Sequence, residues 1–160
     1  KSGWVLENGA LTGNDNPNAD PEILVAIGEL ATSIGAADIT EIEFITTAFD
    51  VSDGGTLQVR VRFNEEVDVT GTPQLTVVND SRANHTLSYA SGTGSNELVF
   101  SLTIAAGGGG VIADGDELSI GANATALNGG TIKDKGTNTA STITNVAGVG
   151  TAAGTITAAA

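Results

Sequence analysis

The chain has 160 residues, a formal net charge of −13 at pH 7 and no cysteine. An acidic surface repels nucleic-acid phosphates and anionic membranes, and the lack of thiols excludes disulfides and thiolate metal sites. No apolar run approaches the roughly 20 residues of a transmembrane helix. The length of 160 residues fits one domain with an arm.

Residues 1–38 are predicted to form an N-terminal arm that carries one short helix. Asp20 is a suitable N-cap, Pro21 suits the first helical position, and Gly35 suits the C-terminal cap. Apolar residues recur between them at helical spacing, which predicts a helix over residues 20–34 with one apolar stripe. The stripe and the single tryptophan are the predicted interface residues: Trp4, Ile23, Ile27, Leu30 and Ile34.

A run of oxygen-bearing side chains precedes the predicted helix. Oxygen ligands at every second position are typical of calcium loops, and Asp15 and Asp20 belong to such a run. The sixth position, however, is Ala19 rather than glycine, and the twelfth is Val25 rather than glutamate. An Asx-rich loop that leads into the helix cap is therefore the favoured interpretation, with Asp15 and Asp20 kept as candidate metal ligands.

The apolar period changes to two from Ile39 onward. Apolar and polar residues alternate over 57–63 and 98–104, as in half-buried strands, and glycine-rich turns separate the segments. The predicted strands are 40–47, 57–63, 74–79, 85–90, 98–104, 117–121 and 131–146. About seven short strands predict a mainly β fold, an immunoglobulin-like β-sandwich over residues 39–147. The Ala/Gly/Thr tail, 148–160, is expected either to fray or to form an edge strand.

Three segments carry a resemblance to a known type of module. They are residues 61–76 (VRFNEEVDVTGTPQLT), 89–100 (YASGTGSNELVF) and 127–134 (LNGGTIKD). In order and spacing they resemble the repeats of giant RTX-type bacterial adhesins and related immunoglobulin-like modules. Related modules of this kind also decorate phage virions. The resemblance implies a sandwich that binds, spaces or cements rather than catalyses. The arm does not look like a preceding repeat, which favours a small standalone protein.

The remaining polar motifs favour structural roles over catalysis. Glu65 and Glu66 are adjacent, so on a strand they point to opposite faces and do not form a hydrolytic pair. His85 is the only histidine, and Gly107–Gly110 lacks the Lys-Ser/Thr of a phosphate loop. No enzymatic activity is therefore expected.

A second acidic turn contains Asp114 and Asp116. The adhesins that the chain resembles often hold calcium between modules through such carboxylates, so both residues are candidate calcium ligands. A solvated turn is the favoured alternative, because only one module is present to supply ligands. Calcium is thus the one cofactor considered.

These observations predict a capsid decoration or cement protein on a virion surface. The partner would be the major capsid protein or identical subunits in a homo-oligomer, bound through the arm. The alternative is an extracellular adhesin module or filament subunit on a bacterial cell surface, in which calcium would stiffen the module. The chain has no methionine, which predicts that residues before Lys1 have been removed or lie outside the given sequence.

Overall fold

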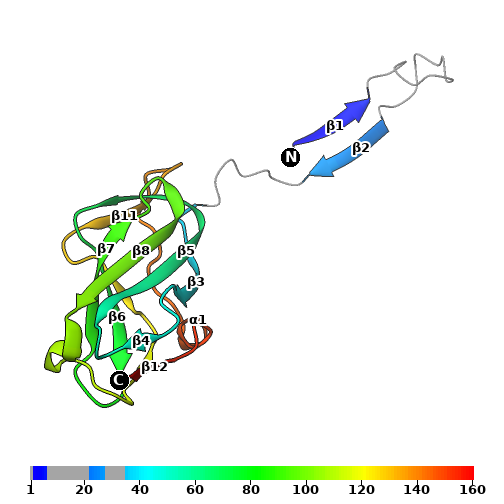
Figure 1. Cartoon of the computed structure of the whole chain (residues 1–160). Coiled ribbons are helices and arrows are strands. Elements are labelled where there is room, and N and C mark those ends of the chain that lie inside the picture. The colour runs from blue at the N-terminus through cyan, green and yellow to red at the C-terminus, as the bar shows by residue number, and fades with distance from the viewer. Residues whose placement is uncertain (1, 7–21, 28–34) are drawn as a thin grey trace. The chain divides into compact units, whose positions relative to one another are not determined.

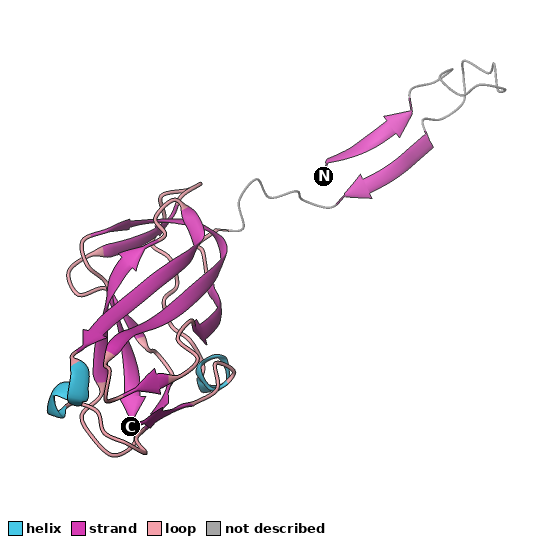
Figure 2. Cartoon of the chain, viewed as in Figure 1, coloured by secondary structure: helices cyan, strands magenta, loops and turns pink. Residues whose placement is uncertain are grey.

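The computed structural model describes residues 2–6, 22–27 and 35–160, and it divides the chain into two compact units, 1–34 and 35–160. About half of the larger unit is strand, and it has two short helical segments (Figure 2). The prediction of a mainly β protein is confirmed.

The first unit contains a two-stranded sheet. Strand β1 (Ser2–Leu6) pairs antiparallel with β2 (Glu22–Ile27), and the register sets Trp4 opposite Val25. The helix predicted over residues 20–34 is therefore wrong across Glu22–Ile27. Three of those six residues are β-branched, and a paired neighbour favours the extended form over a short isolated helix. Leu30 and Ile34 lie outside the described residues.

The second unit is one curled ten-stranded sheet (Figure 1). Its main path runs in the order β11-β5-β8-β7-β6-β9-β12-β4, while β3 also pairs with β5 and β10 with β6. The strands are β3 (Ile39–Phe44), β4 (Phe49–Asp50), β5 (Gly55–Thr70), β6 (Gln74–Asn79), β7 (His85–Ser91), β8 (Ser95–Ile104), β9 (Glu117–Ser119), β10 (Thr125–Ala126), β11 (Thr131–Asp134) and β12 (Ile156–Ala159). The helical segments are η1 (Ala106–Gly110) and α1 (Ala147–Thr151).

Five of the seven predicted strands overlap most of β3, β6, β7, β8 and β9. The strand predicted over 57–63 covers less than half of β5, which continues to Thr70. The seventh, predicted over 131–146, is regular only as β11, and bridges at Ala140 and Thr142 follow it. The tail does not form an edge: β12 lies between β9 and β4, with Ile156 and Ala158 buried.

The sixteen-residue strand β5 organises this sheet. One of its edges pairs with β8 at residues 55–62 and again at Val67. The other edge pairs with β3 at residues 59–63 and with β11 at residues 67–70. A register shift between Arg62 and Val67 interrupts the β8 ladder, as at a β-bulge, which bends a strand and increases its twist. One strand therefore supports three neighbours.

The sheet curls so that its first and last strands are joined by a short connection. Strand β3 pairs with β5 next to β11, which begins the strand order, and β4 ends that order, yet only residues 45–48 link β3 to β4. The inward faces enclose an almost wholly aliphatic core to which Phe63 and Phe100 add the largest side chains. Burial of such a side chain contributes about 1.5–3 kcal/mol, so the core holds the curl closed.

The β7–β8 hairpin shows why glycine is needed at one turn. Gly92 has a φ of 115°, and a Cβ atom there would lie 2.0 Å from the carbonyl oxygen of Glu97. No L-residue with a side chain fits that backbone. Beside the turn, the rings of Tyr89 and Phe100 meet edge to face with centroids 6.1 Å apart.

Replacement of Phe100 by alanine should destabilise the larger unit by about 3–5 kcal/mol, because a fully buried ring would leave a cavity in a core with few aromatics. Urea unfolding followed by circular dichroism measures the change. The control is Ser88→Ala on the exposed face of β7, which should shift stability by no more than about 0.5 kcal/mol. Equal effects of the two substitutions would contradict this placement of the core.

Candidate functional site

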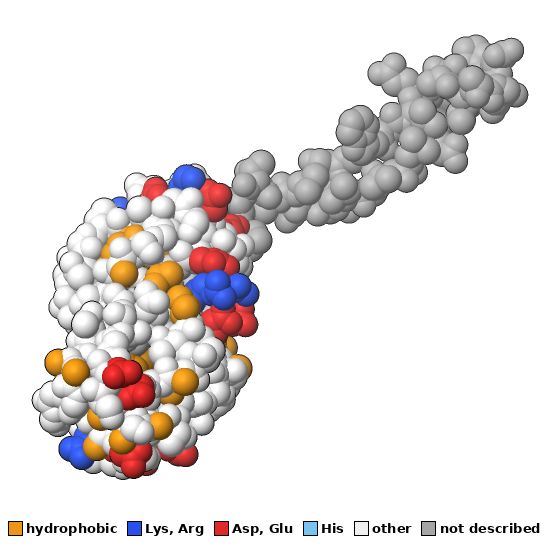
Figure 3. All heavy atoms as spheres, in the orientation of Figure 1, with side chains coloured by type: hydrophobic (Ala, Val, Ile, Leu, Met, Phe, Trp, Pro, Cys, Tyr) orange, Lys and Arg blue, Asp and Glu red, His pale blue; other side chains and the backbone are white. Residues whose placement is uncertain are grey.

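A ladder of charged side chains crosses β3, β5 and β8. Arg62 donates to Glu97 and to Glu41, each at 2.8 Å, and Arg60 pairs with Glu43 and Glu97. Figure 3 shows basic side chains flanked by acidic ones on the face that it presents. Each side chain is about one-third exposed or more, so each pair contributes little alone. The ladder aligns three strands and leaves both arginines occupied.

A second polar cluster is buried beneath the β6–β7 loop. Asp116 Oδ2 accepts hydrogen bonds from Asn79 Nδ2 at 2.9 Å and from the backbone N–H of Ala113 at 3.0 Å. The Arg82 Nε lies 3.0 Å from the same oxygen. Asn79 Oδ1 in turn accepts the backbone N–H groups of Ser81 and Arg82. The cluster therefore ties the loop between β6 and β7 to the turn before β9.

His85 borders this cluster as a neutral ring. Its Nε2 lies 3.4 Å from Asn79 Nδ2, and the residue is buried. Burial lowers the pKa of His85, since the imidazolium would lose its hydration, and the nearby Asp116 carboxylate opposes this only in part. The pKa of Asp116 is also lowered, chiefly by the hydrogen bond from Asn79 and against the effect of burial. The charged carboxylate and the neutral ring are the stable pair of states.

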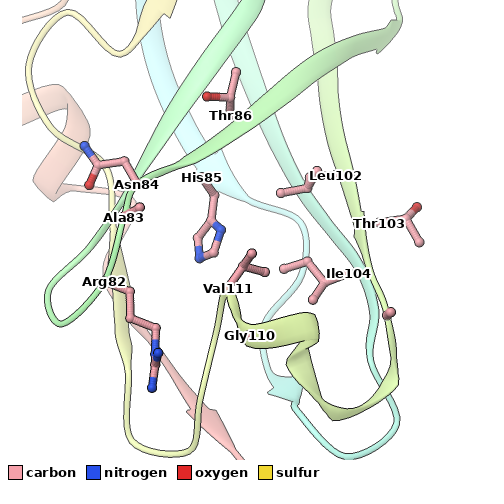
Figure 4. A pocket seen from close by; sticks show the side chains of 11 residues that line it. Arg82, Ala83, Asn84, His85, Thr86, Leu102, Thr103, Ile104, Gly110 and Val111 are labelled. Atoms are coloured by element: carbon pink, nitrogen blue, oxygen red, sulfur yellow. The ribbon is translucent and has the colours of Figure 1, made fainter.

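A cavity of about 430 Å³ opens beside His85. Its walls come from the start of β7, the end of β8 and the chain after η1 (Figure 4). The side chains of His85, Ile104 and Val111 converge on the cavity, whereas Thr103 points away from it (Figure 4). Val111 is about half exposed. The space is thus mainly apolar and open to solvent, and Arg82, Asn84 and Thr86 join His85 as polar residues of its lining.

The predicted metal ligands are separated in the described part of the chain. Asp114 is exposed and accepts the backbone N–H of Ala160 at 3.0 Å, while Asp116 is buried in the cluster above. Among the residues that the structure describes, no group of three or more His, Cys, Asp or Glu side chains could hold a metal ion. Asp15 and Asp20 lie outside those residues, so calcium binding there stays a prediction.

The predicted interface residues fall in the first unit. The register places Trp4 in β1, and Ile23 and Ile27 in β2. The two strands pair with each other in a sheet of their own. Their role at an interface stays a prediction.

A carboxyl pair that the sequence did not reveal joins β5 to β11. Asp134 is 1% exposed, and its Oδ1 accepts the backbone N–H of Thr137 at 2.6 Å and its hydroxyl at 2.8 Å. Its Oδ2 is buried and receives no nitrogen or hydroxyl donor within the described residues. A side-chain hydrogen bond from Glu65 is the largest influence that lowers the pKa of Asp134, followed by the bonds from Thr137. Two carboxyl groups can share a hydrogen bond only when one of them carries a proton.

Comparison with models of known protein families, with curated proteins and with solved structures yields no match for this chain.

Substitution of His85 by glutamine should reduce the loss of stability between pH 7.5 and pH 5.5. The folded protein holds the pKa of His85 below its ordinary value of 6.5, so above that value the residue imposes no proton-linked cost. Below it, the unfolded chain binds a proton that the folded chain rejects, and stability falls until the folded pKa is reached. Urea midpoints at the two pH values measure the difference. The same pH dependence in both proteins would contradict a neutral buried His85.

Glu65→Gln should keep the thermal midpoint within a few degrees of the original protein at pH 7, whereas Glu65→Ala should lower it by several degrees. Glutamine can still donate to the Asp134 carboxylate, whereas alanine removes the hydrogen bond from Glu65 to Asp134. Differential scanning calorimetry compares the matched variants. Equal losses for glutamine and alanine would show that no proton is shared between the two carboxyl groups.

Proposed function

We propose that the chain is a non-enzymatic structural protein of a virion, a capsid decoration protein that binds the outer shell through residues 1–34. Residues 35–160 would project as an immunoglobulin-like β-sandwich. The partners would be the major capsid protein and identical subunits, and the location would be the virion surface.

The pairing of the sequence blocks supports the immunoglobulin-like assignment. The block at 61–76 forms most of β5 and the start of β6, and the block at 127–134 contains β11. These two blocks are neighbours in the sheet, since Ile132 lies opposite Val69 and Asp134 opposite Val67. The third block supplies the end of β7 and most of β8. The residues that carry the resemblance thus take part in strand pairing, as expected of a structural module that spaces or binds.

The observation that carries the proposal is the separate two-stranded unit at the N-terminus. The unit of residues 1–34 is distinct from the ten-stranded unit, and its sheet contains only β1 and β2. An isolated two-stranded hairpin is marginally stable in water. Its strands are rich in large apolar residues, including the single tryptophan. Such a segment gains most of its stability from a partner surface, as an anchoring arm does.

The charges of the chain support a protein partner. With a net charge of −13, nucleic acid and anionic lipid are disfavoured. No helix within the described ranges is long and apolar enough to cross a membrane. Trp4 also favours a protein partner, because tryptophan is enriched among the residues that dominate binding at the centre of protein interfaces.

Deletion of residues 1–34 should abolish binding to the shell while the remaining unit stays folded, because that unit has its own core. Capsids assembled from a candidate major capsid protein are mixed with the full chain or with residues 35–160 and sedimented. The full chain should saturate the capsids, and the shortened chain should bind at least about tenfold more weakly. Far-ultraviolet circular dichroism checks that both proteins are folded.

Addition of EDTA distinguishes the adhesin or filament alternative. Capsid binding and the mass measured by light scattering should be unchanged by the chelator if the protein is a decoration protein without a calcium requirement. Open-ended polymers that dissociate in EDTA, or equal capsid binding by both lengths of chain, would overturn the proposal.

A further inference from the structure

The ten-stranded sheet is split between β7 and β8 at the end away from their hairpin. The ladder between these strands ends at the pair Ser88–Ser101. Both strands continue beyond it for three residues: 85–87 pair with β6 only, and 102–104 pair with β5 only. We call the space between these two three-residue edges the β7–β8 slot.

The slot has backbone hydrogen-bonding groups on both walls. The Tyr89 N–H donates to the Pro73 carbonyl on the β6 side at 2.9 Å. Backbone N–H and C=O groups of successive residues point to opposite edges of a strand, so those of Ser88 and Thr86 point toward β8. The continuing register would set Thr86 opposite Thr103. No backbone bond joins these two residues among those found in the described part of the chain. Each wall therefore presents one free N–H and one free C=O.

The 430 Å³ cavity occupies this slot. Thr86 and Thr103 belong to its walls, and the inward-facing Leu102, Ile104 and His85 line its interior. Leu102 is only partly buried, although Leu98 and Phe100 on the same face of β8 are fully buried. The core is thus incompletely covered where the sheet divides.

We propose that the β7–β8 slot is a docking site for an extended segment and that its occupant is strand β1 of a second copy of this chain. The inserted strand would exchange its pairing with β2 for hydrogen bonds, one edge to the free backbone groups of Thr86 and the other edge to those of Thr103. It would place apolar side chains in the cavity, which is recognition by strand addition.

Length and composition select β1 as the occupant. The slot is three residues long, and within β1 the run Trp4-Val5-Leu6 is an uncharged apolar segment of that length. Only β1 and β2 among the described strands lie outside the ten-stranded sheet, and β2 begins with Glu22. β1 itself carries no charged residue, so it would bring no carboxylate or cation into the mainly apolar slot.

The period of a strand then assigns the faces. Side chains alternate between the two faces, so Trp4 and Leu6 would enter the cavity while Val5 would lie on the outer face between Thr86 and Thr103. Outward neighbours on adjacent strands have Cβ atoms about 4.5–5.5 Å apart, close to the separation that a disulfide bridges.

This inference is independent of the proposed capsid role. A strand given to the next copy is a head-to-tail contact, which closes into a ring or continues as a filament according to the rotation between copies. Its test needs no capsid, so failure here and failure of shell binding are separate results.

The absence of cysteine makes disulfide trapping a direct test. The full chain carrying Val5→Cys and Thr103→Cys is oxidised under mild conditions and resolved on non-reducing gels. We expect covalent dimers and higher species between copies, at least about tenfold more abundant than in the control. The control carries Val5→Cys and Thr157→Cys, since Thr157 is also an exposed threonine on a strand but lies on β12.

Two results would overturn the inference. One is cross-linking no greater than in the control. The other is a link confined to single chains, seen as a faster monomer band, which would assign the slot to the chain's own arm.

A second measurement does not depend on cysteine chemistry. Multi-angle light scattering should show that Trp4→Ala weakens association of the full chain at least about tenfold, whereas the outward Val5→Thr changes it little. Unchanged association of Trp4→Ala, or a monomeric original chain at all concentrations, would likewise contradict docking of β1.

Discussion

The structure depends on the continuous strand β5. Its residues Leu57, Val59 and Val61 are fully buried, and both of its edges are paired. A strand with neighbours on both edges cannot change its register without turning its apolar side chains out of the core. The same strand carries Arg60 and Arg62 on its other face. Core packing and the charged ladder are thus set by one alternating segment.

The curl around β5 explains where polar groups had to be buried. The sheet divides between β7 and β8 at the end away from their hairpin. The β6–β7 loop and η1 lie at that end (Figure 1). Asn79 and Asp116 accept hydrogen bonds from backbone N–H groups of the loops there, where strand pairing no longer supplies acceptors. Buried polar groups of this kind are retained because each has partners. The cavity beside His85 is the part of this region that no side chain fills.

Local pattern predicted the strands of the larger unit well, because alternation and glycine turns are signals within a few residues. It failed for Glu22–Ile27, where apolar spacing fits both a helical stripe and a short strand and where pairing with β1 decides. It could not find the pairing of Glu65 with Asp134, which are far apart in sequence and meet only through the β5–β11 ladder. The slot was equally hidden, since it follows from the point at which one ladder stops. Asp116 was noticed as a carboxylate in a turn, but its burial and its three donors depend on Asn79 and Arg82.

The position of β12 has a consequence for how the protein is made. This strand forms bridges to β9 on one side and, in parallel, to β4 on the other, and the backbone N–H of Val51 donates to the Ala159 carbonyl at 2.7 Å. Strand β4 therefore pairs with a strand that is synthesised more than one hundred residues later. The sheet cannot close before residues 156–159 emerge, and until then the strands made earlier keep an unpaired edge. The strongly acidic composition suits that interval, because mutual repulsion keeps incomplete chains apart while the last strand is being added.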